Sequence, residues 1–186
     1  MTDHWTGSVM IALAACALLV TGVWYAAIRI DRMHRRVDRT RATLQLQLAR
    51  RASVALDIAH SGLWDPVTSI VVAEAARSAI EAEGLGPEES ELTVALRAAL
   101  GDQEQLVEDL NGDDPVKADA LRELADAWYR VELARRFHNE AVSMTRRLRQ
   151  RRTVRWFWLA GRTPMPVSCD IDDAPPAGLE LAQPLA

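Results

Sequence analysis

The chain opens on an uninterrupted apolar stretch. Residues 9–28 read VMIALAACALLVTGVWYAAI and contain no charged side chain. At a rise of about 1.5 Å per residue, a helix of this length extends roughly 30 Å, the thickness of a bilayer's hydrocarbon core. Trp5 precedes the stretch, and Trp24 and Tyr25 lie near its far end, where amphipathic rings favour the headgroup level. The pattern predicts a transmembrane helix over residues 9–28, after a short extracytoplasmic N-terminus of residues 1–8.

Beyond the span, apolar residues recur every three or four positions on an arginine-rich background. This spacing is typical of an amphipathic helix and of coiled coils. The membrane helix is therefore predicted to continue without a break to about His60, where Ser61-Gly62 ends it. Its apolar stripe consists of Ile30, Met33, Val37, Leu44, Leu48, Ala52, Ala55 and Ala59.

Three further helices are predicted from their start and stop signals. Asp65-Pro66 and Asp114-Pro115 each place a capping carboxylate before a proline at the first helical position. The expected helices cover residues 66–83, 87–111 and 115 onward, with Gly101 as a candidate kink in the second of them. The last helix carries an apolar face of Leu121, Leu124, Trp128, Val131, Ala134, Phe137, Ala141, Met144 and Leu148.

Short connections between one-sided helices favour antiparallel neighbours. The predicted fold class is all-α: one N-terminal transmembrane helix continuing into an elongated antiparallel bundle of about four helices, which ends near residue 160. From about Thr163 the sequence is rich in Pro, Asp and Ala and has no periodicity. Residues 161–186 are therefore predicted to be a disordered tail.

The distribution of charge sets the expected orientation. No Lys or Arg precedes the span, whereas arginines follow it closely. The positive-inside rule then places the N-terminus outside and the domain of residues 29–160 in the cytoplasm. Lys117 is the sole lysine among 22 Lys and Arg residues, and Ala is abundant. This usage suggests a high-GC bacterial genome, and hence a bacterial cell membrane.

Two alternatives compete with a plain membrane anchor, a cleaved signal peptide and a lipidated N-terminus. A cleaved signal peptide needs a basic start, but only Asp3 and His4 stand there. Leu13-Ala14-Ala15-Cys16 resembles a lipobox, which would make Cys16 a lipidated N-terminus. The apolar run continues 12 residues past Cys16, which favours a small apolar residue in a membrane helix.

A second arginine cluster precedes three aromatic residues at positions 146–158. Basic and aromatic side chains together suit either a bilayer interface or a nucleic-acid strand. The anchor and the net charge of −4 favour lipid, so nucleic acid is the less favoured partner. The interfacial candidates are Arg29, Arg32, Arg35, Arg36, Arg146, Arg147, Arg149, Arg151, Arg152, Arg155, Trp156, Phe157 and Trp158.

No arrangement of catalytic, cofactor-binding or metal-binding residues is recognisable in the sequence. It has no glycine-rich phosphate loop, no HExxH and no GxSxG, and its acidic pairs fall at helix starts, where they stabilise the helix dipole. His138 is expected to pack at the edge of the last helix's apolar face. Its neighbours Phe137 and Asn139 are candidates for structural or partner contacts, with Asn139 either solvated or bridging to another helix.

Three stretches of the chain resemble the LemA family of bacterial membrane-anchored proteins. Arg36-Val37-Asp38, with Leu44, Gln47-Leu48 and Arg50-Arg51, is similar to the family's first helix. Residues 89–96, ESELTVAL, resemble a helix start of the form E-N-E-L-x-x-A-L. Residues 130–142, RVELARRFHNEAV, resemble R-I-x-x-A-R-x-x-Y-N-D-A-V.

The sequence also departs from the family. His138 replaces the usual tyrosine, Thr40 or Arg41 the tryptophan of the first helix, and residues 52–56 an L-I-P-N-L-V stretch. After Val142 an arginine run replaces the family's Y-N-x-x-I and S-F-P.

The resemblance implies an all-α antiparallel bundle without established catalysis, acting as a scaffold or adaptor for other membrane proteins. The expected function is a membrane-anchored interaction protein whose partners are the bilayer and another membrane protein or a second copy. The alternative is an enzyme or enzyme subunit with a site in the bundle core.

Overall fold

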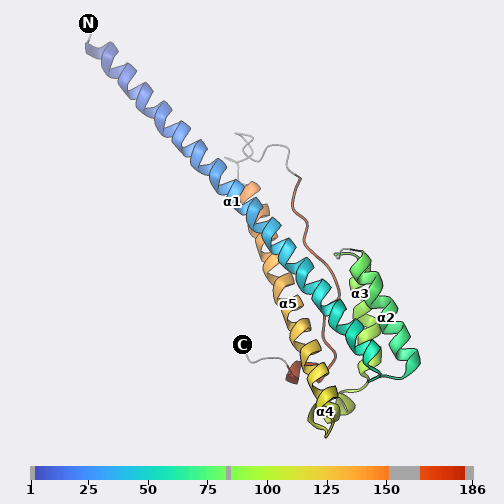
Figure 1. The fold of residues 1–186 in the computed structure, drawn as a ribbon. Coiled ribbons are helices and arrows are strands. Elements are labelled where there is room, and N and C mark those ends of the chain that lie inside the picture. The colour runs from blue at the N-terminus through green and yellow to red at the C-terminus, as the bar shows by residue number, and fades with distance from the viewer. Residues whose placement is uncertain (1–2, 83–84, 151–163, 183–186) are drawn as a thin grey trace. The chain divides into compact units, whose positions relative to one another are not determined.

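A computed structural model describes residues 3–82, 85–150 and 164–182. In those ranges the chain forms α-helices, one short 3-10 helix and no strand, so the all-α prediction is confirmed (Figure 1). The elements are α1 (Asp3–Ser61), α2 (Pro66–Glu81), α3 (Pro87–Leu100), α4 (Gln103–Asn111), α5 (Pro115–Arg149) and η1 (Leu179–Ala182).

The helix α1 is continuous from Asp3 to Ser61, as its sequence predicts, and it ends where Gly62 adopts a positive φ of 79°. None of residues 9–28 is buried, although their side chains are almost all apolar. Among the described helices, α1 is the one long and apolar enough to cross a membrane.

The chain divides into two compact units, and α1 and α5 contribute to both. Unit 1 contains Met1–Arg39 and Glu140–Ser168. In it Val37 of α1 packs against Ala141 and Val142 of α5. His34 accepts a hydrogen bond from Arg149, so here the two helices run antiparallel.

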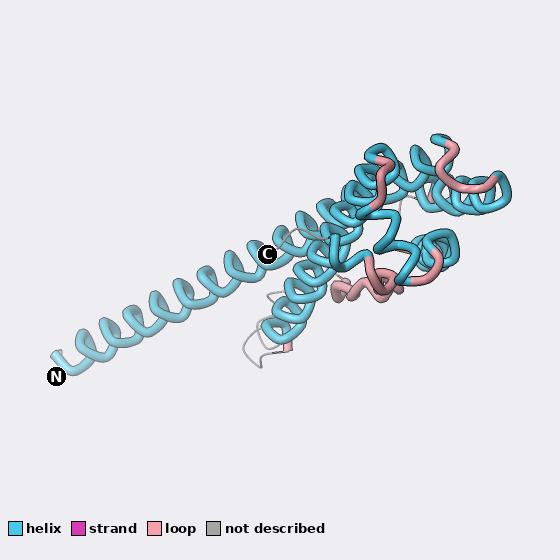
Figure 2. The backbone as a smooth tube through the Cα atoms, turned by 90° about the horizontal axis from the view of Figure 1, so that it is seen from below, coloured by secondary structure: helices cyan, strands magenta, loops and turns pink. Residues whose placement is uncertain are grey.

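Unit 2 contains Thr40–Asn139 and Cys169–Ala186. In it Leu44 and Leu48 of α1 pack against Val131 and Ala134 of α5, again in antiparallel order. The helices α2 and α3 form a hairpin beside them (Figure 2). Their apolar faces complete a core whose largest member is Trp128, with Leu92, Leu96, Leu106, Leu110, Leu121 and Leu124 around it.

The predicted helix starts are confirmed by their caps. The Asp65 carboxylate accepts hydrogen bonds from the backbone N–H groups of Val67 and Thr68. Asp114 does the same for the two residues after Pro115. The predicted helix over 87–111 is instead two helices, because Gly101 takes a positive φ of 68° and Asp102 is extended. This conformation breaks a helix rather than bending it.

The prediction of a disordered tail is wrong for residues 164–182, which we call the C-terminal segment. Up to Pro176 the segment has no helix or strand and runs as an extended trace (Figure 1), and it buries Cys169, Ile171, Asp173 and Leu179. The sequence lacks helical periodicity here because the segment is a strand-like chain that packs on helices with only a few apolar side chains.

The apolar face predicted for α5 is correct up to Ala134 and at Ala141, and it is wrong at Phe137 and Met144. After Val131 and Ala134 the buried positions are His138, Ala141, Val142 and Thr145, while Phe137 is 50% exposed and Met144 40% exposed. The buried face advances by sevens from Leu124 through Val131 and His138 to Thr145. This period places the polar His138 and Thr145 on the buried face and leaves Phe137 and Met144 at its edge.

Candidate functional site

A buried ion pair lies at the centre of unit 2. Arg51 of α1 donates to the Glu89 carboxylate of α3 at 2.9 Å, and both side chains are at most 1% exposed. Arg51 also donates to the Glu89 carbonyl oxygen and to Thr93 Oγ1, each at 3.2 Å. Its guanidinium lies 5.2 Å from the ring centroid of Trp128, within range of a cation–π interaction.

Burial and pairing act in opposite directions on these charges. Desolvation raises the pKa of Glu89, and the nearby Arg51 charge partly offsets this rise. Desolvation likewise lowers the pKa of Arg51, against the attraction of Glu89. Because an isolated buried charge is far more costly than a paired one, each side chain depends on the other.

The C-terminal segment lies directly over this centre and is held by its backbone. The indole Nε1 of Trp128 donates to the Asp173 carbonyl oxygen at 2.6 Å. The Asn139 amide pairs with Cys169 in both directions at 2.9 Å, donating to its carbonyl oxygen and accepting from its N–H. These contacts recognise an extended main chain, whatever side chains it carries.

Two neighbouring carboxylates of the segment are bound through their side chains, so these contacts depend on the segment's sequence. Asp172 receives a two-point interaction from Arg97 of α3, at 2.7 and 2.8 Å. Arg135 of α5 donates to Asp173 at 2.5 Å. The hydrogen bonds from Arg97 hold the pKa of Asp172 below its usual value. The segment thus carries an acidic pair matched by one arginine from each of two helices.

Buried apolar side chains hold the segment on both sides of its acidic pair. Cys169 and Ile171 enter the cluster formed by Leu44, Leu48 and Val131, and Leu179 is fully buried in the main core. Gly178 adopts a φ of 101° against Gln103, a conformation that favours glycine. Burial raises the pKa of the Cys169 thiol, which makes it a packing group rather than a nucleophile.

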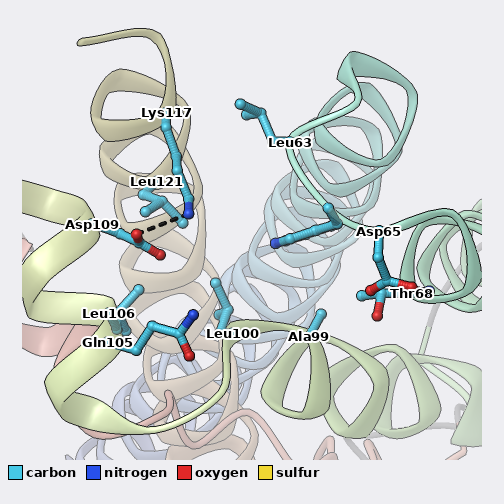
Figure 3. Close-up of a pocket in the computed structure, with 11 residues that line it drawn as sticks. Leu63, Asp65, Thr68, Ala99, Leu100, Gln105, Leu106, Asp109, Lys117 and Leu121 are labelled. Atoms are coloured by element: carbon cyan, nitrogen blue, oxygen red, sulfur yellow. Dashed lines mark hydrogen bonds and ion pairs between the residues drawn. The ribbon is translucent and has the colours of Figure 1, made fainter. Parts of the chain in front are cut away.

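A separate cavity of about 220 Å³ lies where the turn between α1 and α2 meets α4 and α5. In Figure 3, Lys117 and Asp109 lie on one side of it, joined at 2.8 Å, and Asp65 and Thr68 on the other. These polar groups already have partners, since Asp65 caps α2. The cavity therefore presents no pair of groups poised for acid–base chemistry.

The residues singled out beside Phe137 have clear structural positions. His138 is 2% exposed, and its Nδ1 lies 3.3 Å from Thr40 Oγ1, so it is more deeply buried than expected. Asn139 does bridge two parts of the chain, but its partner is the C-terminal segment rather than a helix. Phe137 lies on the exposed edge of α5 and is not a core residue.

The interfacial candidates fall into three groups. Arg29, Arg32, Arg35 and Arg36 are exposed on α1. In unit 1, Arg146 and Arg149 donate to the carbonyl oxygens of Pro166 and Pro164, each at 2.8 Å, and Arg147 is exposed and donates to Ser143. The remaining candidates, Arg151, Arg152, Arg155, Trp156, Phe157 and Trp158, lie outside the described residues.

No group of three or more His, Cys, Asp or Glu side chains in the described ranges could hold a metal ion. Comparison with known proteins finds no matching family model, no matching curated protein and no matching solved structure.

Sequence reasoning missed the central network. Arg51 entered the sequence analysis only through the family-like motif and Glu89 through an acidic pair at a helix start, while Asp172 and Asp173 fell in the predicted disordered tail. One signal was present: Arg51 directly precedes Ala52, on the apolar side of α1, where a charge requires a buried partner.

Proposed function

We propose that the chain is a membrane-anchored interaction protein, held by residues 9–28 and carrying its helical domain on the cytoplasmic face of a bacterial membrane. One observation carries the proposal. Within the described part of the chain no residue of the apolar stretch of α1 is buried, whereas positions on one face of the same helix are buried from Ile30 onward. An uncovered apolar helix of this length is stable in lipid, where all its backbone hydrogen bonds are internal.

Unit 1 supports a second contact with the bilayer. The apolar stretch ends at Ile28, and Arg149 at the end of α5 contacts His34, only six residues later. At 1.5 Å per residue this is about 9 Å along α1. We infer that the arginines and aromatics of residues 146–158 lie at the membrane surface, where each cation contributes about 1 kcal/mol beside anionic lipid.

A scaffold or adaptor of the LemA type is the class of protein we propose. The resemblance of residues 36–51, 89–96 and 130–142 to that family supports it, as does the helical fold of these stretches. Asn139 matches an asparagine of the family's pattern. In this structure its side-chain amide pairs with the backbone of Cys169.

An exposed apolar surface on the α2–α3 hairpin supports binding to another protein. Val67, Ile70 and Val71 of α2 are 71%, 70% and 53% exposed, and Val94 of α3 is 59% exposed. Ile70, Val71 and Ala75 line a shallow hollow together with Glu74, Ser78 and Glu91. Exposed apolar surfaces rimmed by polar groups are typical of protein-binding sites.

Reporter fusions test the membrane topology. A reporter active only in the cytoplasm and one active only outside it are fused in turn to the C-terminus. We expect activity from the cytoplasmic reporter alone. Activity of the external reporter alone would reverse the proposed orientation, and recovery of the chain in the soluble fraction would exclude the anchor.

Photo-crosslinking in living cells tests the interaction. A photoreactive amino acid at Ile70 should give discrete crosslinked products, whereas the same group at exposed Arg130 on α5 should give few. Equal labelling at the two positions would remove the α2–α3 surface from the proposal. The products also separate a second copy from a different membrane protein by their mass.

A further inference from the structure

Within unit 2, residues 169–179 of the C-terminal segment contact the helices in the manner of a peptide ligand. Their backbone is recognised by Trp128 and Asn139, and their acidic pair by Arg97 and Arg135. We call the surface formed by these four side chains the tail-binding surface. Its members come from α3 and α5, and it recognises an extended chain by the same combination of contacts that peptide-binding domains use.

We propose that the tail-binding surface is a recognition site for an extended acidic peptide, and that the C-terminal segment of a second copy of this chain occupies it in exchange for the chain's own segment. The inference rests on the proposed function in assuming that the chain associates with proteins at the membrane. It adds the site and the chemistry of one such association.

The ligand's features follow from the contacts. The main chain must be extended, because Asn139 pairs with both polar groups of one residue. An Asp-Asp pair is required by the two arginines, since bidentate Arg97 favours a carboxylate over an amide. A small or branched apolar residue must precede the pair, because Ile171 is buried beside Leu44 and Leu48.

The contacts also allow exchange. Arg97 and Asp172 are 31% and 44% exposed and Arg135 is 29% exposed, so water reaches these arginine contacts, whereas Ile171, Asp173 and Leu179 are buried. Exchange requires the segment to open locally and to expose these buried side chains, which costs less free energy than unfolding the whole domain. A second copy offers identical contacts, so exchange costs only association entropy. Confinement to one membrane raises the effective concentration and lowers that cost.

Complementary full-length copies test the exchange. One copy carries R97Q and N139A, which damage the tail-binding surface but leave the segment intact. The other carries D172N and D173N, which damage the segment but leave the surface intact. The two copies bear different affinity tags and are co-expressed and co-purified from membranes in mild detergent. Each pair of identical variants serves as a reference, and a pair carrying R130Q on both copies is the matched arginine control.

We expect the complementary pair to co-purify at least about tenfold more than either pair of identical variants, because only it restores one complete set of charge-assisted contacts between copies. The wild-type and R130Q pairs should associate equally. Co-purification of the complementary pair no greater than that of the identical variants would overturn the second copy as occupant.

A labelled peptide tests the site itself. The probe is a fluorescent peptide of residues 167–182, added to full-length protein in nanodiscs. The D172N/D173N chain should bind it about tenfold or more tightly than wild type does, since its own segment competes less. A probe with both aspartates changed to asparagine should not bind. Equal binding of a scrambled probe, or no gain over wild type, would overturn the recognition site.

Circular dichroism tests whether the C-terminal segment is needed only to maintain the helical fold. The D172N/D173N chain should retain the helical signal of wild type. Loss of helicity would show that the segment is an inseparable part of the fold and would overturn the proposal. Crosslinks at Ile70 report the α2–α3 surface independently, so failure of the tail-binding surface and failure of the proposed interaction function are distinguishable.

Discussion

Arg149 Nη1 lies 3.4 Å from His34 Nε2, and His34 Nδ1 lies 3.0 Å from the carbonyl oxygen of Ile30. Arginine can only donate, so Nε2 accepts and Nδ1–H donates, which defines one tautomer of the ring. This pair holds the end of α5 beside the part of α1 that directly follows the apolar stretch. The proposed lipid contact of residues 146–158 depends on this placement of the end of α5.

We predict that a fragment of residues 29–186, which keeps the described packing of both units, binds anionic vesicles and not neutral ones. Salt should weaken the binding, because the arginines are attracted to anionic headgroups through screened charge. Changing Trp156 and Trp158 to alanine should weaken it further, whereas R122Q should not. Vesicle flotation measures each case. Failure to float with either lipid would exclude the interfacial contact.

The buried ion pair should respond asymmetrically to mutation. Glu89→Ala leaves the buried Arg51 charge unpaired, and we expect it to lower the free energy of unfolding by about 3–5 kcal/mol. Replacing both residues by apolar ones (R51M/E89L) should cost much less, since no charge remains buried. Chemical denaturation of the 29–186 fragment measures both, with exposed Glu91→Ala as the matched control. A double variant as unstable as Glu89→Ala would contradict this account.

The two large aromatic residues of α5 should differ in their contribution to stability. Trp128 is fully buried, so Trp128→Ala should lower the free energy of unfolding by about 3–5 kcal/mol. Phe137 is half exposed, so Phe137→Ala should cost only about 1 kcal/mol. Thermal melting distinguishes them. A cost for Phe137→Ala equal to that for Trp128→Ala would place its ring in a core.

Acidification should loosen the C-terminal segment. Hydrogen bonds from Arg97 lower the pKa of Asp172 in the folded state below its unfolded value, which is about 3.9. Its contribution to stability is therefore complete above the unfolded pKa and is lost as pH falls through the folded pKa. Because the pair is partly exposed, we expect less than about 1 kcal/mol. The difference in stability between wild type and D172N, measured by melting against pH, should shrink below about pH 4.

The sequence by itself determined the elements that depend on local chemistry. The apolar run of residues 9–28 and the three-and-four spacing after it define one long helix, and Asp65-Pro66 and Asp114-Pro115 define two helix starts. The underlying reasons are local: side-chain periodicity, capping hydrogen bonds and the fixed φ of proline. Gly101 was recognised as a weak point, but its positive φ, which divides the expected helix, depends on how α3 and α4 pack.

Only the tertiary structure decided which polar residues are buried. Arg51 and Glu89 are 38 positions apart in sequence, and Asn139 and Cys169 are 30 apart, so no local pattern relates them. The C-terminal segment has too few apolar residues to fold by itself, yet helices from distant parts of the chain supply the partners for its backbone and its carboxylates. The composition of this segment alone predicts disorder. It does not indicate the order seen here, because the hydrogen bonds that order the segment come from residues in other elements.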